Sequence, residues 1–216
     1  RNEDKKETSI RIQTSILNGV EKKVLIYLAN RQPQWMTSNI LTVIGIIGAI
    51  IISLGYILSR INLNYLWISS LGFVINWYGD SLDGTLARVR NRQRPVFGYY
   101  LDHTMDIVNE LLIFIGLGLS GLIHFELSLL LFIVYLMLTV NVSINAHLKK
   151  EFKLTYAGLG PTEFRILAVL VNTIYIYSHT INSFTQTFSC FGKDIVFSSF
   201  DLMGVIVLVI LSLMYI

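Results

Sequence analysis

Six apolar runs constrain what this chain can fold into, because each is long enough, or nearly so, to cross a membrane as a helix. The hydrocarbon layer is ~30 Å thick, and a helix rises ~1.5 Å per residue. The sequence therefore predicts an all-α, six-transmembrane-helix bundle. The predicted spans are Ile40–Leu58, Leu63–Tyr78, Leu101–Ile123, Leu127–Ile144, Ile166–Tyr177 and Phe200–Ile216. We expect the second to continue as helix beyond Tyr78, and the fifth to begin nearer Thr162.

The composition supports a membrane location. Of the 216 residues, 53% are hydrophobic and 14% are charged, so the excess apolar side chains must face lipid instead of water. The single cysteine, Cys190, excludes an internal disulfide, and no His/Cys cluster surrounds it to bind zinc. The polar start of the sequence is not followed by an apolar stretch at signal-peptide distance. We therefore expect the first span to remain as a membrane anchor.

The cations predict the orientation of the spans, since translocated loops contain few lysines and arginines. If the N-terminus is cytoplasmic, only Arg60 and Lys193 of the 17 lysines and arginines fall on the opposite side. We expect an integral, multi-pass membrane protein with both termini and the active site cytoplasmic.

A segment with helical spacing of apolar residues precedes the first span. Over residues 9–32, apolar side chains alternate at this spacing with polar ones that include Lys22 and Lys23. This pattern predicts an N-terminal amphipathic interfacial helix, with the lysines toward lipid headgroups. The alternative is a soluble helix packed on the cytoplasmic loops. We expect one domain over residues 1–216, with the six-helix bundle over residues 37–216.

Four aspartates occupy helices that should be apolar. Asp80 and Asp83 lie at the cytoplasmic end of the second span, and Asp102 and Asp106 at the start of the third. A carboxylate within a membrane helix costs on the order of 2.5–3.5 kcal/mol, so each requires a reason. At about 100° per residue, each pair shares one helix face. The connection between the two helices is short, so we expect antiparallel neighbours whose acidic faces meet.

Converging carboxylates need cations, because each close pair repels by several kcal/mol at an effective dielectric constant of about 20. Aspartate oxygens without His or Cys select hard ions such as Mg²⁺, Mn²⁺ or Ca²⁺ over zinc. Two such ions would suit chemistry on a diphosphate, whose charge they would neutralise.

The aspartates are part of a longer pattern. It runs Asp80-x-x-Asp83-Gly84-x-x-Ala87-Arg88 and, after nine residues, Gly98-x-x-x-Asp102-x-x-x-Asp106. The pattern resembles the signature of the CDP-alcohol phosphatidyltransferases at all eight positions. The six spans and the N-terminal helix extend this resemblance over nearly the whole chain. It implies a membrane enzyme of phospholipid biosynthesis that binds two divalent cations, Mg²⁺ or Mn²⁺, and forms a homodimer.

The resemblance also implies roles for single residues. Asp80, Asp83 and Asp102 would ligate metal, while Asp106 would both hold metal and act as the base. Small residues would let the nucleotide lie close to the helix, and an arginine would meet the diphosphate. The residues assigned to the CDP donor are Gly84, Ala87, Arg88, Gly98, Asn39 and Thr42. At Gly98 we also expect a tight approach of the third helix to its neighbour.

A second polar group surrounds the start of the fifth span. Lys153 and Arg165 could line a pocket for an anionic acceptor such as inositol phosphate or glycerol phosphate, with Glu163 orienting Arg165. The alternative is that these cations only follow the positive-inside bias and touch anionic lipid.

The reaction implied by the resemblance moves the substituted phosphoryl group of a CDP-alcohol to an acceptor hydroxyl and releases CMP. We expect CDP-diacylglycerol as the donor, a small polar alcohol as the acceptor, and membrane lipid but no nucleic acid as a partner. The reverse arrangement, a CDP-aminoalcohol with diacylglycerol as acceptor, uses the same signature. An ion or proton transporter is the alternative from another class, but its aspartates would be expected near the midplane instead of at one face.

The third span contains a glycine pattern that resembles a dinucleotide-binding motif, Gly116-Leu-Gly118-Leu-Ser-Gly121. No strand precedes it, so the dinucleotide interpretation is rejected. We expect close helix packing through these small residues instead.

Overall fold

The structure is a computed structural model, and it describes residues 10–12, 17–149, 151–153, 160–190 and 193–215. The all-α prediction is confirmed for this part of the chain, because helices dominate it. The long helices are α2 (Ser38–Leu58), α3 (Leu66–Val89), α4 (Pro95–Leu119), α5 (Phe125–Lys149), α6 (Pro161–Tyr177) and α8 (Ser199–Tyr215). The smaller elements are β1 (Ile10–Ile12), α1 (Asn18–Arg31), η1 (Leu63–Tyr65), β2 (Glu151–Lys153), α7 (His179–Asn182), β3 (Thr185–Cys190) and β4 (Lys193–Ser198).

The six long helices coincide with the six predicted apolar runs, and several begin or end outside them. The second predicted helix continues through Tyr78 to Val89, as expected. α4 begins at Pro95, before the apolar run, and α6 begins at Pro161. A proline suits the first helical position, where its fixed φ is helical and its missing N–H has no partner to lose.

The N-terminal segment differs from the prediction. The helix expected over residues 9–32 begins only at Asn18, and Ile10–Ile12 instead form a short strand parallel to Glu151–Lys153. α1 buries Leu25 and Ala29 in a cluster with Leu82 and Leu86 of α3. Part of the helix therefore packs on the bundle, and its place in a membrane interface stays a prediction.

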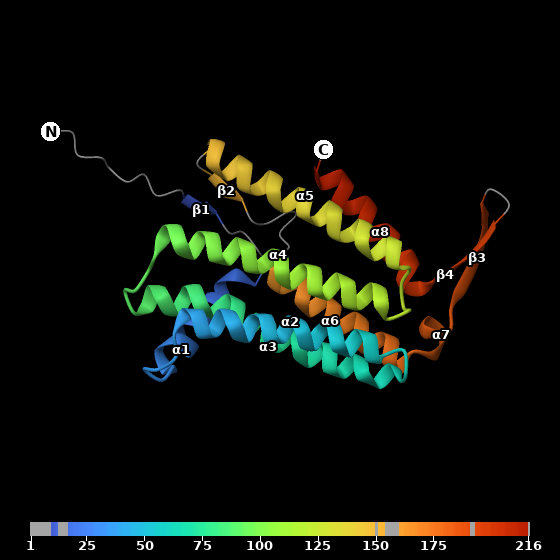
Figure 1. Cartoon of the computed structure of the whole chain (residues 1–216), viewed down its shortest axis with the longest axis horizontal. Helices are drawn as coiled ribbons and strands as arrows, with labels where there is room; N and C mark the ends of the chain where they lie inside the picture. The colour runs from blue at the N-terminus through green and yellow to red at the C-terminus, as the bar shows by residue number, and fades with distance from the viewer. Residues whose placement is uncertain (1–9, 13–16, 150, 154–159, 191–192, 216) are drawn as a thin grey trace.

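Residues 185–198 form a feature that no apolar run indicated. β3 and β4 pair as an antiparallel hairpin in the connection between α7 and α8. Figure 1 shows the hairpin projecting beyond the helices, at the end of the bundle away from α1.

One helix of the described chain, α2, is long and apolar enough to cross a membrane by itself. Shorter apolar stretches occupy Phe125–Asn141 of α5 and Ser199–Leu213 of α8. α3 and α4 carry the aspartates within their length, which lowers their hydropathy, and α6 has 17 residues. The crossing of a membrane by all six helices remains a prediction.

Glycines set the distance between α2 and α3. A Cβ on Gly79 would lie 2.2 Å from the backbone nitrogen of Gly45, and one on Gly48 would lie 2.4 Å from that of Asn76. This contact also carries hydrogen bonds, because the Asn76 side chain donates to the Gly45 carbonyl at 2.9 Å. No side chain larger than hydrogen fits at these positions, so the register of the two helices is fixed.

The glycine pattern of the third predicted span does pack helices together, as expected. A Cβ on Gly116 of α4 would meet the Ser53 side chain of α2 at 2.4 Å, and one on Gly118 would meet Phe125 at 2.7 Å. α4 therefore lies directly against α2 near the end of both helices.

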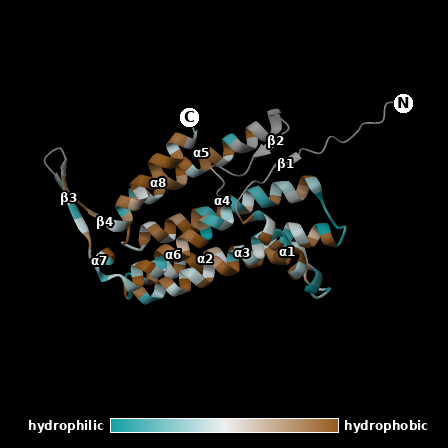
Figure 2. Cartoon of the chain, turned by 180° about the vertical axis from the view of Figure 1, so that it is seen from behind, coloured by the Kyte–Doolittle hydropathy of each residue, from teal (hydrophilic) through white to brown (hydrophobic). Residues whose placement is uncertain are grey.

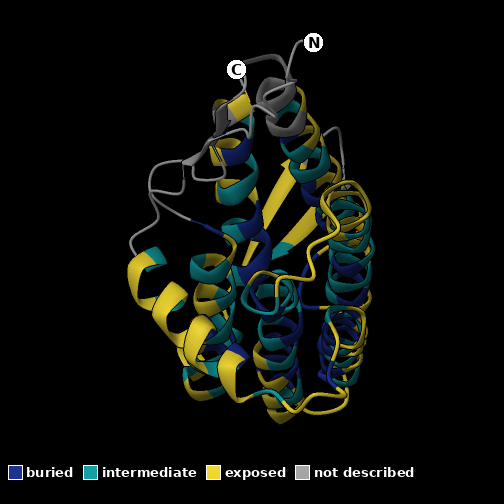
Figure 3. Cartoon of the chain, turned by 90° about the vertical axis from the view of Figure 1, so that its left-hand side faces the viewer, coloured by how far each residue is buried: buried dark blue, intermediate teal, exposed yellow. Residues whose placement is uncertain are grey.

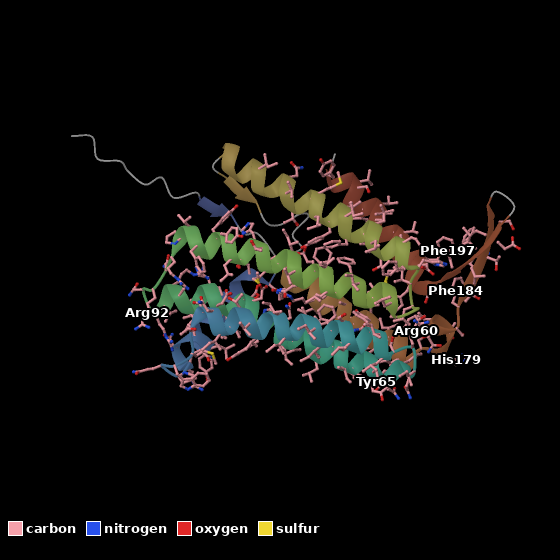
Figure 4. All side chains as sticks on the ribbon, viewed as in Figure 1. Arg60, Tyr65, Arg92, His179, Phe184 and Phe197 are labelled. Carbon is pink, nitrogen blue, oxygen red and sulfur yellow. The ribbon has the colours of Figure 1, made fainter. Side chains whose placement is uncertain are left out.

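The bundle has two chemically different ends. In Figure 4, Arg92 in the α3–α4 connection lies at one end, and Arg60, Phe184 and Phe197 lie at the other. Figure 2 shows apolar residues dominating α2, α5, α6 and α8, with hydrophilic residues gathered at the α3–α4 connection. In Figure 3 the buried residues form stripes on the inner faces of the helices, and exposed residues cover the outer faces.

Candidate functional site

The structure brings three of the four predicted aspartates together. Carboxylate oxygens of Asp80 on α3 and of Asp102 and Asp106 on α4 all lie within 4.8 Å of one another. The expected meeting of two acidic helix faces is thus found for these three residues. Asp102 is exposed, whereas Asp80 and Asp106 are half-buried, so the cluster opens to the surface on one side.

The glycine contact between α2 and α3 positions this cluster. Gly79 rests on the α2 backbone at Gly45, and Asp80 is the next residue of α3. α2 also contacts α4 near Gly116, so one helix sets the positions of both acidic helices. Three helices held at close backbone distances leave the carboxylates little freedom to move apart.

Asp83 lies beside the cluster and is held by α2. The Thr42 hydroxyl donates to Asp83 Oδ2 at 2.6 Å, and the Ser38 hydroxyl donates to the Asp83 carbonyl at 2.9 Å. Thr42, expected to contact the donor, is therefore a partner of an aspartate of the signature. The helical spacing places Asp80 and Asp83 on one broad face, but Asp80 turns toward α4 and Asp83 toward α2.

Arg165 of α6 also reaches the acidic cluster. Its Nη2 lies 2.5 Å from Oδ2 of Asp80, and both side chains are mostly buried. The residue expected to bind the acceptor is thus an ion-pair partner of a predicted metal ligand. A guanidinium at this place offsets part of the repulsion among the carboxylates.

Glu163 anchors the start of α6. Its Oε2 accepts from the Gly160 N–H at 2.9 Å, and its Oε1 accepts from the Leu17 N–H at 3.0 Å. It thereby caps the helix that carries Arg165. Lys153, the third residue expected at the acceptor, pairs with Ile12 through the β1–β2 backbone, and its side chain lies outside the part of the chain that the structure describes.

The residues expected at the CDP donor lie on α2, α3 and α4, the helices that carry or support the acidic cluster. A Cβ on Gly84 would meet only Arg88 Nη1, at 3.5 Å, so the helix surface there is accessible. Arg88 Nη2 donates to the Thr85 hydroxyl at 2.9 Å, and Ala87, on the same helix, is half-buried. Asn39 accepts from Arg94 Nη2 at 2.6 Å, which links α2 to the α3–α4 connection.

The expectation for Gly98 was wrong in one respect. A Cβ on this residue would meet nothing within 4 Å, so α4 makes no tight approach to a neighbour there. The first turns of α4 are exposed, and close helix contact occurs further along, at Gly116. A donor-binding role for Gly98 stays a prediction.

Sequence reasoning missed Glu110 and Tyr135. Glu110 lies one turn beyond Asp106 on α4, and Tyr135 of α5 is close enough to interact with its carboxylate. The signal was present, because Glu110 extends the four-residue spacing of Asp102 and Asp106 into an apolar span. A carboxylate at such a position is a candidate for function by the same physical argument as the aspartates.

The acidic cluster fits a hard divalent cation. Its donor atoms are carboxylate oxygens, which Mg²⁺ and Mn²⁺ prefer, and they converge from two helices without His or Cys. Gly84, on the same helix as Asp80, has only Arg88 within 4 Å of a Cβ placed on it. The acidic cluster can therefore hold a metal ion, with exposed helix surface on α3 nearby.

Comparison with known proteins places this site in a family. A search of the curated proteins found no match. The family model described as CDP-alcohol phosphatidyltransferase matches residues 35–214, most of the chain and all of the site. Proteins of this family are membrane-associated transferases of phospholipid biosynthesis that use divalent metals, a CDP-alcohol donor and an alcohol acceptor. The chain belongs to the CDP-alcohol phosphatidyltransferase family.

Proposed function

We propose that this protein transfers the phosphatidyl group of CDP-diacylglycerol to the hydroxyl of a small polar alcohol and releases CMP. The observation that carries the proposal is the convergence of Asp80, Asp102 and Asp106 in a chain that matches the family over residues 35–214. The family match also favours a transferase over an ion or proton transporter.

The four aspartates would hold two divalent cations, Mg²⁺ or Mn²⁺. Asp80, Asp102 and Asp106 supply the converging oxygens, and Asp83 supplies a carboxylate that Thr42 orients. When bound, the cations neutralise the diphosphate of the donor and stabilise the departing CMP.

The donor would lie across the open side of the cluster. Gly84 leaves the helix surface free, and the exposed Arg88 stands beside it with donors suited to a phosphate. Ala87, Gly98, Asn39 and Thr42 would complete the contacts to CDP. The exposure of the first turns of α4 agrees with a nucleotide that arrives from the water phase.

Asp106 would act as the base. It lies one turn further from the open end of α4 than Asp102, so an acceptor hydroxyl can approach it from beneath the diphosphate. Asp106 takes the hydroxyl proton, the acceptor oxygen attacks the phosphorus distal to cytidine, and the bond to CMP breaks. Arg165, paired with Asp80, would contact the acceptor side, with Glu163 fixing its helix and Lys153 nearby in the chain.

The six long helices would cross the membrane, with both termini and the active site cytoplasmic. The physical support is that each of them exposes large apolar side chains, which water would not favour. Examples are Leu54, Val74, Leu119, Ile133, Leu170 and Val209. The α3–α4 connection, which contains Arg92, joins the helices that carry the four aspartates, and the positive-inside bias favours a cytoplasmic location for such a connection.

The test is to incubate purified protein with labelled CDP-diacylglycerol, Mg²⁺ or Mn²⁺ and a panel of alcohols, and to measure CMP release and the lipid product. We expect turnover with at least one small polar alcohol, its loss in excess chelator, and its recovery when metal is restored. A parallel reaction contains CDP-ethanolamine and diacylglycerol. Turnover only in that reaction would reverse the donor and acceptor, and full turnover in chelator would exclude the metal site.

A further inference from the structure

Glu110 and Tyr135 extend the site beyond the aspartates of the signature. Asp102, Asp106 and Glu110 follow one another at single-turn intervals along α4, which places them on one face of the helix. Tyr135 reaches Glu110 from α5. Glu110 is also close enough to Asp80 and Arg165 to interact with their charges. The residue therefore belongs to the same site, at its inner end.

One oxygen of Glu110 has no partner in the described part of the chain. Oε2 is buried and accepts no hydrogen bond, while Tyr135 lies close enough to interact with the same carboxylate. A buried carboxylate oxygen without a donor costs free energy. A ligand that brings a hydrogen-bond donor to this oxygen would recover that cost.

We propose that Glu110 and Tyr135 form the inner acceptor subsite, which selects an alcohol whose second polar group is an uncharged or cationic hydrogen-bond donor. The inference rests on the proposed function, because it assumes that Asp106 receives the reacting hydroxyl. Four residues, ~6 Å at ~1.5 Å per residue, separate Asp106 from Glu110 along the helix axis. A two- or three-carbon alcohol spans this distance with its hydroxyl at Asp106 and its second donor at Glu110.

The charges at this end of the site oppose an anionic acceptor. The proposed cations would balance Asp80 and Asp106, but Glu110 is a further carboxylate one turn beyond Asp106, and Arg165 is already engaged with Asp80 at 2.5 Å. A phosphate on the acceptor would meet the unpartnered oxygen of Glu110, which offers it no donor. The subsite therefore favours a second hydroxyl or an ammonium group over the phosphorylated acceptors that Lys153 and Arg165 suggest by sequence.

Three alcohols of nearly equal size test the inference: propan-1-ol, ethane-1,2-diol and ethanolamine, which end in a methyl, a hydroxyl and an ammonium group. The kcat and KM for each acceptor, and the KM for the donor, are measured with CDP-diacylglycerol and saturating metal. For the parent protein we expect kcat/KM for the diol and for ethanolamine to exceed that for propan-1-ol at least tenfold. Glycerol 3-phosphate should be a poorer acceptor than glycerol.

Variants assign this preference to the subsite. In Glu110→Leu, kcat/KM for the three alcohols should converge to within about threefold, while donor KM stays within about twofold of the parent value. Glu110→Gln keeps the shape but removes the charge, so kcat/KM should fall more for ethanolamine than for the diol. Tyr135→Phe should lower kcat/KM for both of these acceptors several-fold. Glu126→Gln, at an exposed position in the first turn of α5, is the matched control and should change nothing.

The possible failures are distinguishable. If the parent releases CMP but uses the three alcohols equally, or if the Glu110 variants keep its preference, the subsite is wrong and the proposed function stands. If the parent releases no CMP with any alcohol, the proposed function falls and the subsite with it. Thermal unfolding of each detergent-purified variant identifies loss of fold. Should Glu110→Leu unfold, the milder Glu110→Gln and Tyr135→Phe variants decide the question.

Discussion

Both ends of the bundle hold carboxylates that are partly or wholly buried, but their partners differ. At the hairpin end, Asp201 accepts from the His124 N–H at 2.7 Å and from the Ser198 N–H at 2.8 Å, and His124 Nδ1 lies 2.9 Å from it. At the other end, Asp80 and Asp106 face each other and Asp102 across less than 4.8 Å. The first arrangement is complete without a ligand, whereas the second gathers repelling charges.

This contrast teaches that burial alone does not mark a functional carboxylate. Asp201 is 2% exposed and lies in the first turn of α8, where exposed backbone N–H groups and the helix dipole favour an acidic residue. Its role is to join β4, α8 and the start of α5. A carboxylate whose neighbours are other carboxylates needs a cation to balance its charge, and such a cluster therefore indicates a metal site.

The largest expected effect comes from Asp106→Asn. The substitution keeps the size and one oxygen but removes the proton acceptor, so turnover should fall by roughly 10²–10⁴-fold, as is usual for loss of a general base. The thermal unfolding temperature should stay near that of the parent, because repulsion among carboxylates decreases. Turnover and donor affinity at saturating metal are the measurements. Turnover within a few-fold of the parent would show that the proton leaves by another route.

The mirror substitution is Asp201→Asn, which should damage stability and spare chemistry. An amide can accept only one of the two backbone hydrogen bonds through its oxygen and places an NH₂ against a backbone donor, at a cost of about 1–3 kcal/mol. We expect a lower unfolding temperature in detergent and an unchanged KM for the CDP donor. A large loss of turnover per folded molecule would remove the distinction between the two ends.

Asp83 lies between the two kinds of carboxylate, and Thr42→Val sharpens its role. Valine keeps the shape of threonine but removes the 2.6 Å hydrogen bond to Asp83, which a charged acceptor strengthens to about 1.5–3 kcal/mol. Metal and donor affinity should weaken by roughly ten-fold, less than in Asp83→Asn, with turnover at saturation retained. Calorimetric titration of metal measures this. If Thr42→Val and Asp83→Asn lose equal metal affinity, the hydrogen bond from Thr42 accounts for the whole contribution of the Asp83 carboxylate.

The smallest expected effect on stability is that of Gly98→Ala. A Cβ there meets nothing within 4 Å, and alanine favours a helix over glycine by no more than about 1 kcal/mol. The unfolding temperature should therefore stay constant or rise slightly. Gly116→Ala is the comparison at the packed end, where the new Cβ would lie 2.4 Å from Ser53 and overpacking costs about 1–3 kcal/mol. Equal unfolding temperatures for the two variants would contradict the inference that α4 is unpacked at Gly98 and tightly packed at Gly116.

The sequence by itself determined the helices and the residues of the acidic cluster, because both depend on local spacing. Apolar runs mark the positions of the six long helices, and intervals of three and four residues place Asp80, Asp83, Asp102 and Asp106 on shared faces. Glu110 follows the same interval and could have been predicted in the same way. The β3–β4 hairpin and the late start of α1 could not be predicted, since no run of local residues indicates their partners.

Only the tertiary structure decided how the polar helix faces are oriented and which side chains of other helices they contact. The glycine contact at Gly45 and Gly79 fixes the rotation of α3 against α2, and this rotation sends Asp80 to α4 and Asp83 to Thr42. It also brings Arg165, from α6, onto Asp80. Spacing along one helix specifies which residues share a face. The partner of that face depends on packing between helices far apart in the sequence, which side-chain volume and backbone distance set together.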